Sequence, residues 1–259
     1  METTNNAFLN QPDYGLVSII MPNYNSEAFI ESSIQSVLAQ SYKNWELLFV
    51  DDCSTDRSVE KANAFNDDRI KIFLKQKNEG AASARNFAIE KAAGRWIAFL
   101  DSDDSWAPDK LKEQIEFMIN KNVAFSFTDY KVITKSGNVL FYKPPKSVCT
   151  YNDILKHNHI GCLTAVYDAE RLGKIYMPEN AVKREDLACW LSILKKGVNA
   201  VCLHEFLAEY VIHSHSVSSN KAQMIKYQWN VYRKVERLSF FKSLYCLACW
   251  AISGLKKYR

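Results

Sequence analysis

Three carboxylates stand within four residues in the segment Asp101-Ser102-Asp103-Asp104. Like charges this close repel one another unless a cation or hydrogen-bond donors lie among them. Carboxylate oxygens are hard ligands that suit Mg²⁺ or Mn²⁺, and Mg²⁺ usually takes one or two protein carboxylates together with phosphate oxygens. The segment therefore predicts a metal site that holds a phosphorylated ligand. A solvated acidic turn is the simpler interpretation, because Asp and Ser are ordinary turn residues.

Other acidic and nucleotide-binding motifs fit the sequence less well. An EF-hand loop that began at Asp101 would need Gly at position 106 and Glu at position 112, where the chain has Trp106 and Lys112. The glycine-rich dinucleotide motif and the P-loop motif are both missing from the sequence. A phosphatase-type aspartyl nucleophile at Asp101 stays open, although that motif usually ends the first strand and here would end the fourth.

The chain around these carboxylates alternates between strand and helix patterns. Apolar runs of strand length lie at 17–22, 45–50, 70–74, 96–100 and 124–130, and helical patterns lie between them at 28–40, 54–66, 81–93 and 108–121. This alternation predicts an α/β fold with a mostly parallel central sheet and helices on both faces. Asp51 and Asp52 end the second predicted strand, so two acidic groups should share the carboxyl edge, where ligands bind in such sheets.

The patterns beyond residue 130 are weaker. Ser136-Gly137-Asn138 predicts a hairpin turn, 187–196 a helix that Gly197 ends, 201–212 a strand, and the chain from about Lys221 a helical extension. The uncharged stretch 243–255 is too short to span a membrane. Its basic flanks fit a helix at a membrane surface, and a helix packed on the domain is the alternative.

Composition and charge limit the class of protein. The 259 residues are 47% hydrophobic and 24% charged, which is ordinary for a soluble globular chain with one large domain or one domain and an appendage. The seven scattered cysteines favour a reducing compartment, and the pair Cys246 and Cys249 is only a weak metal or redox motif. The first fifteen residues are polar, so we expect no secretory signal and a cytoplasmic protein.

The net charge of +4 is distributed unevenly along the chain. Residues 221–259 contain nine Lys or Arg and one acid, which gives +8 and leaves −4 for the preceding 220 residues. A basic, apolar tail favours an anionic partner. We expect that partner to be the inner face of the plasma membrane and not nucleic acid.

Five blocks together resemble the inverting family 2 glycosyltransferases of the GT-A fold. They are Met21-Pro22-Asn23-Tyr24-Asn25, Val50-Asp51-Asp52-Cys53-Ser54-Thr55-Asp56, the segment 78–86 with the sequence NEGAASARN, Phe99-Leu100-Asp101-Ser102-Asp103-Asp104, and Arg184-Glu185-Asp186. The resemblance is close over 16–130, loose over 150–215 and absent from the tail. It implies a GT-A domain at 16–215, with a nucleotide-binding half at 16–130 and an acceptor-binding half at 131–215, followed by a basic helical tail at 216–259.

The resemblance also assigns residues to the nucleotide-sugar donor. They are Asp52 as the acid that recognises the base, Pro22 and Tyr24 as the lining of the base pocket, Arg85 near the base and phosphates, Asp101 at the ribose, and Ser102 and Asp103 in the same donor-binding segment.

The metal ligand and the catalytic base follow from the same comparison. Asp103 would bind the Mn²⁺ or Mg²⁺ ion that bridges the diphosphate, with Asp104 as the alternative ligand. Asp186 resembles the catalytic base, although an acid at a helix start can also be a simple cap. His213 lies where the family often has a Tyr-Arg-x-His segment and would touch the metal or the diphosphate. Val211 replaces the arginine of that segment, so a phosphate-clamping arginine is not expected there.

The resemblance finally implies an activity. We expect a metal-dependent enzyme that moves a sugar from a nucleotide-diphosphate donor, UDP-linked, to a saccharide carried on a polyprenyl diphosphate. Such a reaction belongs to the assembly of O-antigen, capsule or exopolysaccharide. The alternative is a catalytically silent module that binds a sugar nucleotide or saccharide at the membrane surface.

Overall fold

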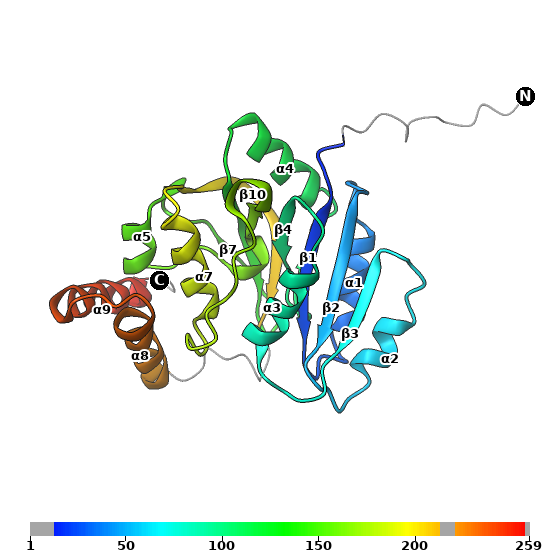
Figure 1. Ribbon diagram of the computed structural model, residues 1–259, viewed down its shortest axis with the longest axis horizontal. Helices are drawn as coiled ribbons and strands as arrows, with labels where there is room; N and C mark the ends of the chain where they lie inside the picture. The colour runs from blue at the N-terminus through cyan, green and yellow to red at the C-terminus, as the bar shows by residue number, and fades with distance from the viewer. Residues whose placement is uncertain (1–12, 213–220, 257–259) are drawn as a thin grey trace, which may run out of the picture.

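One mixed sheet forms the centre of the molecule, which a computed structural model describes over residues 13–212 and 221–256 (Figure 1). The strand order is β3-β2-β1-β4-β9-β6-β10-β5, with β7 paired to β6 and β8 paired to β10. The strands are β1 (Val17–Asn23), β2 (Trp45–Asp51), β3 (Ile70–Leu74), β4 (Trp96–Phe99), β5 (Ser105–Trp106), β6 (Phe125–Ile133), β7 (Val139–Tyr142), β8 (Val148–Cys149), β9 (Val166–Asp168) and β10 (Ala200–Val211).

Helices cover both faces of this sheet, as the alternating sequence pattern predicts. They are α1 (Ile30–Leu38), α2 (Ser58–Asn63), α3 (Ala81–Lys91), α4 (Lys110–Asn120), α5 (Tyr151–Lys156), α6 (Ala169–Leu172), α7 (Glu185–Leu194), α8 (Lys221–Asn230) and α9 (Phe240–Lys256), with a 3-10 turn at Cys162–Thr164 and a π-helical turn at Val231–Val235.

Two apolar cores lie on the two faces, because successive strand residues point in opposite directions. Ile19 joins the core under α1 and α4, while its neighbour Ile20 joins the core under α3 and α7. In the second core the rings of Phe99 and Trp190 meet edge to face, with centroids 5.3 Å apart. Buried residues on both faces explain why the strands read as continuous apolar runs.

The predicted parallel arrangement holds for β3, β2, β1 and β4, which pair in parallel throughout. Beyond β4 the sheet is mixed, because β9 lies between β4 and β6 and pairs antiparallel with both. The long strands β6 and β10 therefore still run in the direction of β1 and pair in parallel with each other. β9 was not predicted, because it has three residues and no recognisable period.

Gly94 follows α3 and lies at a close approach between two backbone segments. The chain leaves α3 at Ala92 in an extended conformation, and Gly94 then passes close to β1. A Cβ atom at Gly94 would lie 2.6 Å from the carbonyl oxygen of Leu16 and 2.7 Å from the amide nitrogen of Ser18. Glycine is therefore required by this close approach of two backbones.

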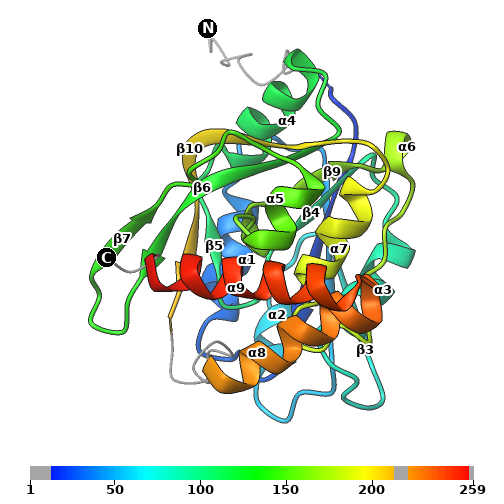
Figure 2. The ribbon, with the colours of Figure 1, turned by 90° about the vertical axis from the view of Figure 1, so that its left-hand side faces the viewer.

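The predicted helical tail packs against the domain, where α9 crosses α5 (Figure 2). The buried Tyr232 hydroxyl donates to the carbonyl oxygen of Leu155 at 2.5 Å, and Lys195 lies 2.7 Å from the buried Glu236 carboxylate. One face of the tail thus belongs to the domain core. Within the described residues, none of the helices combines the length and apolar character needed to cross a membrane.

Candidate active site

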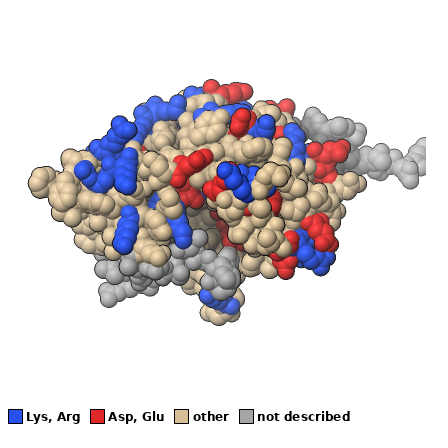
Figure 3. Space-filling model, turned by 60° about the horizontal axis from the view of Figure 1, so that its bottom comes forward, with Lys and Arg blue, Asp and Glu red and all other residues tan. Residues whose placement is uncertain are grey.

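The carboxyl ends of the parallel strands and the start of α7 together carry most of the predicted site residues. Figure 3 looks toward this edge and shows acidic side chains gathered around a hollow, with Lys and Arg side chains toward the side of α8 and α9. Asp52 follows β2, Asp101 to Asp104 follow β4, and Asp186 lies in the first turn of α7. The sheet topology therefore brings two of the predicted acidic groups to one edge, as expected for an open α/β sheet.

The two aspartates that end β2 have different environments. Asp51 is buried and accepts hydrogen bonds from Asn23 Nδ2 at 2.7 Å and from the backbone nitrogen of Ser54 at 2.8 Å, so it closes the β1 and β2 loops. Asp52 accepts from the backbone nitrogen of Gly80 at 2.6 Å and lies 3.0 Å from Lys75 Nζ. The Asp52 carboxylate is thus fixed between the end of β2 and the start of α3.

The two residues predicted to line the base pocket are at the end of β1. Pro22 lies within β1 and pairs with Val50 of β2. Tyr24 follows the strand and has half of its surface exposed, at 50%. An exposed aromatic ring at the end of β1 is a suitable surface for stacking a nucleotide base.

Arg85 connects the end of β4 to the start of α7. Its guanidinium lies 2.5 Å from Asp101 Oδ1 and 3.3 Å from Glu185 Oε1, and the residue is only 6% exposed. Burial opposes the charged form, but the nearby Asp101, Glu185 and Cys162 together raise the pKa of Arg85 well above its usual value. A permanent cation therefore stands between the two acidic groups of the site.

The acidic segment after β4 is held in place from two sides. The Ser102 hydroxyl lies 2.8 Å from Ser26 Oγ, and the Ser102 carbonyl accepts from Ser33 Oγ at 2.9 Å. Asp104 is buried and accepts a hydrogen bond from the backbone nitrogen of Val211 at 3.2 Å. Asp103 is partly exposed between them. Of the two candidate metal ligands, Asp103 is therefore the more accessible.

The donor atoms of this segment suit a hard divalent cation. Burial, and then the charges of Asp103 and Asp101, raise the pKa of Asp104 well above its usual value. A cation among these carboxylates would remove that repulsion, and an all-oxygen donor set is the one that Mg²⁺ and Mn²⁺ prefer. The residues present therefore fit the metal that the sequence predicts.

Asp186 lies in the first turn of α7, beside Glu185. Burial, and then the charge of Glu185, raise the pKa of Asp186 above its usual value. Asn158 Nδ2 donates to Asp186 Oδ2 at 3.4 Å from the loop after α5. A carboxylate with a raised pKa, held near an ion-paired arginine, has the properties of a general base.

Sequence reasoning missed several residues of this site, and one predicted residue cannot be placed. Glu185 belongs to the Arg184-Glu185-Asp186 block but was not predicted to have a role of its own. Lys75, Asn158 and Cys162 have no local sequence signal, because their partners are distant in the sequence. The predicted ligand His213 lies outside the described residues.

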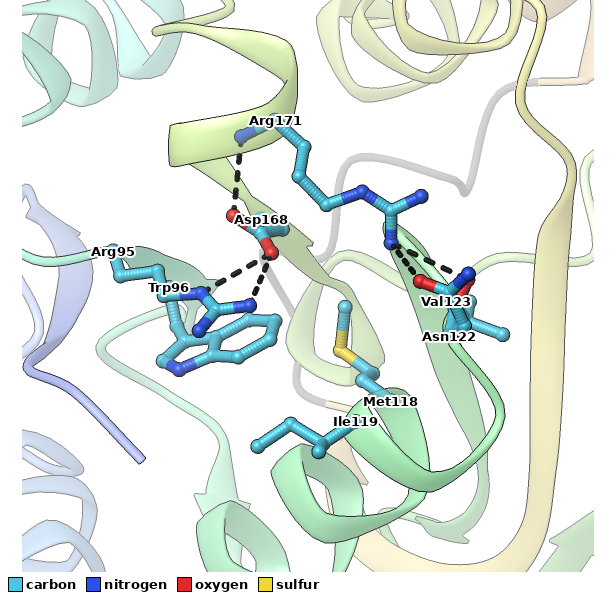
Figure 4. A pocket seen from close by; sticks show the side chains of 8 residues that line it. All are labelled: Arg95, Trp96, Met118, Ile119, Asn122, Val123, Asp168 and Arg171. Carbon is cyan, nitrogen blue, oxygen red and sulfur yellow. Dashed lines mark hydrogen bonds and ion pairs between the residues drawn. The ribbon is translucent and has the colours of Figure 1, made fainter. Parts of the chain in front are cut away.

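A separate pocket lies at the opposite end of β4 (Figure 4). There the Arg95 guanidinium pairs with Asp168 at 2.8 Å and stacks over the ring of Trp96, 4.3 Å from its centroid. These two charges are paired with each other, and none of the predicted site residues that the structure describes lines the pocket. We therefore place the candidate active site at the acidic edge and not here.

Comparison with known proteins identifies the family. The model of glycosyl transferase family 2 matches residues 18–166, which include all the acidic groups at the ends of β2 and β4. The chain belongs to glycosyl transferase family 2. The expected GT-A fold is confirmed by solved structures of similar shape.

Among sequence relatives, this chain is 48% identical over 246 residues to the putative teichuronic acid biosynthesis glycosyltransferase TuaG of Bacillus subtilis. The alignment covers 93% of this chain and 97% of that protein. This chain is also 42% identical over 247 residues to the Escherichia coli UDP-Glc:alpha-D-GlcNAc-diphosphoundecaprenol beta-1,3-glucosyltransferase WfgD, with coverage of 95% and 96%.

Among solved structures, S. aureus TarS 1-349 in complex with UDP-GlcNAc has a TM-score of 0.68 at 21% identity, over 90% of this chain and 70% of that chain. The mannosyltransferase PcManGT of Pyrobaculum calidifontis, in complex with GDP-Man and Mn2+, has a TM-score of 0.66 at 19% identity, over 90% and 69%.

Proposed function

We propose that this family 2 enzyme is a metal-dependent, inverting transferase that moves a sugar from a UDP-sugar to a saccharide linked to polyprenyl diphosphate. The observation that carries the proposal is the pair of ion pairs made by Arg85. One is with Asp101 on the donor side, and the other is with Glu185, which is next to the candidate base Asp186. The relative named for a UDP-Glc donor and a diphosphoundecaprenol-linked acceptor supports these substrate classes. The teichuronic acid relative supports a place in the synthesis of bacterial surface polysaccharides.

The donor would bind across the ends of β1, β2 and β4. We assign the base to Tyr24, Pro22 and Asp52, and the ribose to Asp101. Ser102 fixes the backbone of the acidic segment through its contacts with Ser26 and with Ser33 of α1. Asp103 would hold Mn²⁺ or Mg²⁺, and Asp104 is the alternative ligand. When bound, the cation supplies Lewis-acid stabilisation of the charge that develops on the departing diphosphate. Arg85 adds a fixed positive charge beside that position.

The acceptor would approach from the side of α7. An inverting displacement needs one base on the face opposite the leaving group, and that base takes the proton of the attacking hydroxyl. Asp186 suits this role, because Asn158 orients its carboxylate and burial raises its pKa. As the glycosidic bond breaks, the new bond forms to the acceptor oxygen and the nucleotide leaves as UDP.

A panel of UDP-sugars tests this assignment. With Mn²⁺ and a lipid-linked GlcNAc acceptor, we expect release of UDP from one UDP-hexose to depend on the acceptor and to stop when EDTA is added. The measurement is coupled detection of UDP together with mass spectrometry of the extended acceptor. Tight binding of UDP with no transfer to the lipid-linked saccharide would instead indicate a binding module.

The pH profile of transfer should show the raised pKa of Asp186. Because only the ionised carboxylate can accept a proton, kcat/KM should fall as the pH drops through that pKa, above the ordinary value of 3.8. Glu185→Gln removes a neighbouring negative charge, so the acidic limb should move to lower pH. An acidic limb that does not respond to Glu185→Gln would argue that another group is the base.

We also propose that α9 docks on the inner face of the plasma membrane, through a stripe defined by Phe240, Phe241, Leu244, Tyr245 and Ile252. These side chains are 50–82% exposed and recur at helical spacing. Figure 2 shows α9 at the surface of the fold, with one side left uncovered by the domain. The exposed cations Arg233, Lys234, Arg237 and Lys242 lie in the same tail, so the partner with matching charge is an anionic lipid surface.

Vesicle flotation measures this docking. The protein should float with vesicles that contain phosphatidylglycerol and less with neutral phosphatidylcholine vesicles. Phe241→Glu should weaken partitioning by at least about tenfold, because an inserted large apolar side chain contributes roughly 1.5 kcal/mol or more. Ile119→Glu, an exposed apolar position on α4, is the matched control and should bind like the wild type. Equal flotation of all three proteins would overturn the assignment.

A further inference from the structure

A second group of metal-binding side chains lies away from the acidic edge, between β6 and β10. It consists of Asp129 on β6 and of Cys202 and His204 on β10. Their ligand atoms all lie within 4.8 Å of one another. Cys202 and His204 are two residues apart, so a strand presents both side chains on the same face. The pairing of β10 with β6 shifts register between Leu203 and Phe206, which places an irregularity at His204.

The three ligand atoms have the spacing of one face of a tetrahedron around a single metal ion. Cys202 Sγ lies 3.5 Å from Asp129 Oδ1 and 3.6 Å from His204 Nδ1, and Nδ1 lies 3.0 Å from Oδ1. Zinc bonds of about 2.3 Å to sulfur and about 2.0–2.2 Å to nitrogen and oxygen give tetrahedral edges of about 3.3–3.6 Å. The atoms are therefore already close to the spacing that a zinc ion would impose.

Two further observations point to a ligand. Asp129 is completely buried, and its second carboxylate oxygen, Oδ2, has no hydrogen-bond partner among the described residues. A buried carboxylate oxygen without a partner is costly, and a cation would compensate it. The other ring nitrogen of His204, Nε2, lies 2.9 Å from Ser147 Oγ. Histidine ligands of metals usually make such an outer hydrogen bond, which fixes the ring and its tautomer.

The arrangement does not fit a nucleophilic cysteine. In a Cys–His–Asp relay the thiol and the acid contact opposite nitrogens of the imidazole. Here both Cys202 and Asp129 face Nδ1, and Nε2 faces Ser147. The thiol and the carboxylate both lie near the same ring nitrogen, Nδ1. Three ligands of one central ion would have this arrangement.

We propose that Asp129, Cys202 and His204 form a zinc site that is separate from the Mn²⁺ or Mg²⁺ site at Asp103. A thiolate and an imidazole select zinc over the hard cations that oxygen ligands prefer, so the two sites would not compete for the same metal. The ion would tie β6 to β10. The ion would also hold the segment before β8, because Ser147 in that segment contacts His204 through its hydroxyl. The carbonyl oxygen of Ser147 accepts a hydrogen bond from the backbone nitrogen of Cys202 at 2.7 Å. Three protein ligands would leave the fourth tetrahedral position of the ion to water.

Elemental analysis and cobalt spectroscopy of the full chain test the proposal. Protein purified without chelators or a metal-affinity tag should contain about one zinc per chain, as expected for one three-ligand site. Exchange with Co²⁺ should give a thiolate-to-cobalt charge-transfer band and the intense visible bands of tetrahedral cobalt. His204→Gln and Cys202→Ser should remove both the zinc and the charge-transfer band.

Matched variants separate this site from others. Asp103→Asn should keep the zinc and the cobalt band, because oxygen ligands give no thiolate charge transfer. Cys249→Ser in α9 should keep them as well. Wild-type protein that takes up no zinc, or a cobalt band that survives in both His204→Gln and Cys202→Ser, would overturn the proposal. His204 is 30% exposed in its side chain, so His204→Gln should fold even where a change at buried Asp129 fails.

Discussion

Sugar transfer should fall by about 10²–10⁴-fold in Asp186→Asn, while the affinity for UDP in the presence of Mn²⁺ should stay close to that of the wild type. The range is that of a general base removed from a transition state. The amide keeps the shape of the side chain but cannot take the proton of the acceptor hydroxyl. The measurement is kcat for acceptor-dependent UDP release, paired with calorimetric titration of UDP.

The exposed Asp68, in the loop before β3, provides the control for this variant. Asp68→Asn removes one carboxylate from the same chain without touching the site, and it should transfer sugar at the wild-type rate. Transfer by Asp186→Asn at more than about a tenth of the wild-type rate would show that another group is the base.

The second large effect concerns the metal. In the wild type, UDP and Mn²⁺ should each raise the affinity for the other, since binding couplings are reciprocal. Asp103→Asn should abolish that coupling and lower transfer by about 10³-fold, because Lewis-acid stabilisation contributes several kcal/mol to the transition state. Calorimetric titrations of UDP with and without Mn²⁺ measure the coupling directly.

Asp109, an exposed acid next to the start of α4, supplies the matched comparison. Asp109→Asn should retain both the coupling and the transfer rate. If the wild type bound UDP equally well with and without Mn²⁺, the metal assignment at Asp103 would be wrong, whatever the variants did.

The first half of the fold could be predicted because its strands and helices are encoded by patterns of neighbouring residues in the sequence. The apolar runs that became β1, β2 and β4 are buried on both faces, and the acidic residues follow them directly in the chain. The sequence position of Asp52 and Asp103 was therefore enough to bring them to one edge. The tail, too, had a clear helical pattern, although only the structure shows that Tyr232 fixes one face of it to α5.

The rest depends on contacts between residues far apart in the sequence. β9 is only three residues long, and its position is set by its pairing with β4 on one side and β6 on the other. The partners of Arg85 and Asp186, which are Glu185 and Asn158, are 100 and 28 residues away from them. The cluster of Asp129 with Cys202 spans 73 residues and exists only when β6 pairs with β10.

The ion pairs of Arg85 have a consequence for the order of events during turnover. Two arginines, Arg85 and Arg184, stand among five acids, which are Asp101, Asp103, Asp104, Glu185 and Asp186, so the site is negatively charged overall even when Asp104 carries a proton. A nucleotide diphosphate is itself an anion and is repelled by such a site. The donor should therefore enter together with its cation or after it, and free UDP should leave readily once that cation is lost.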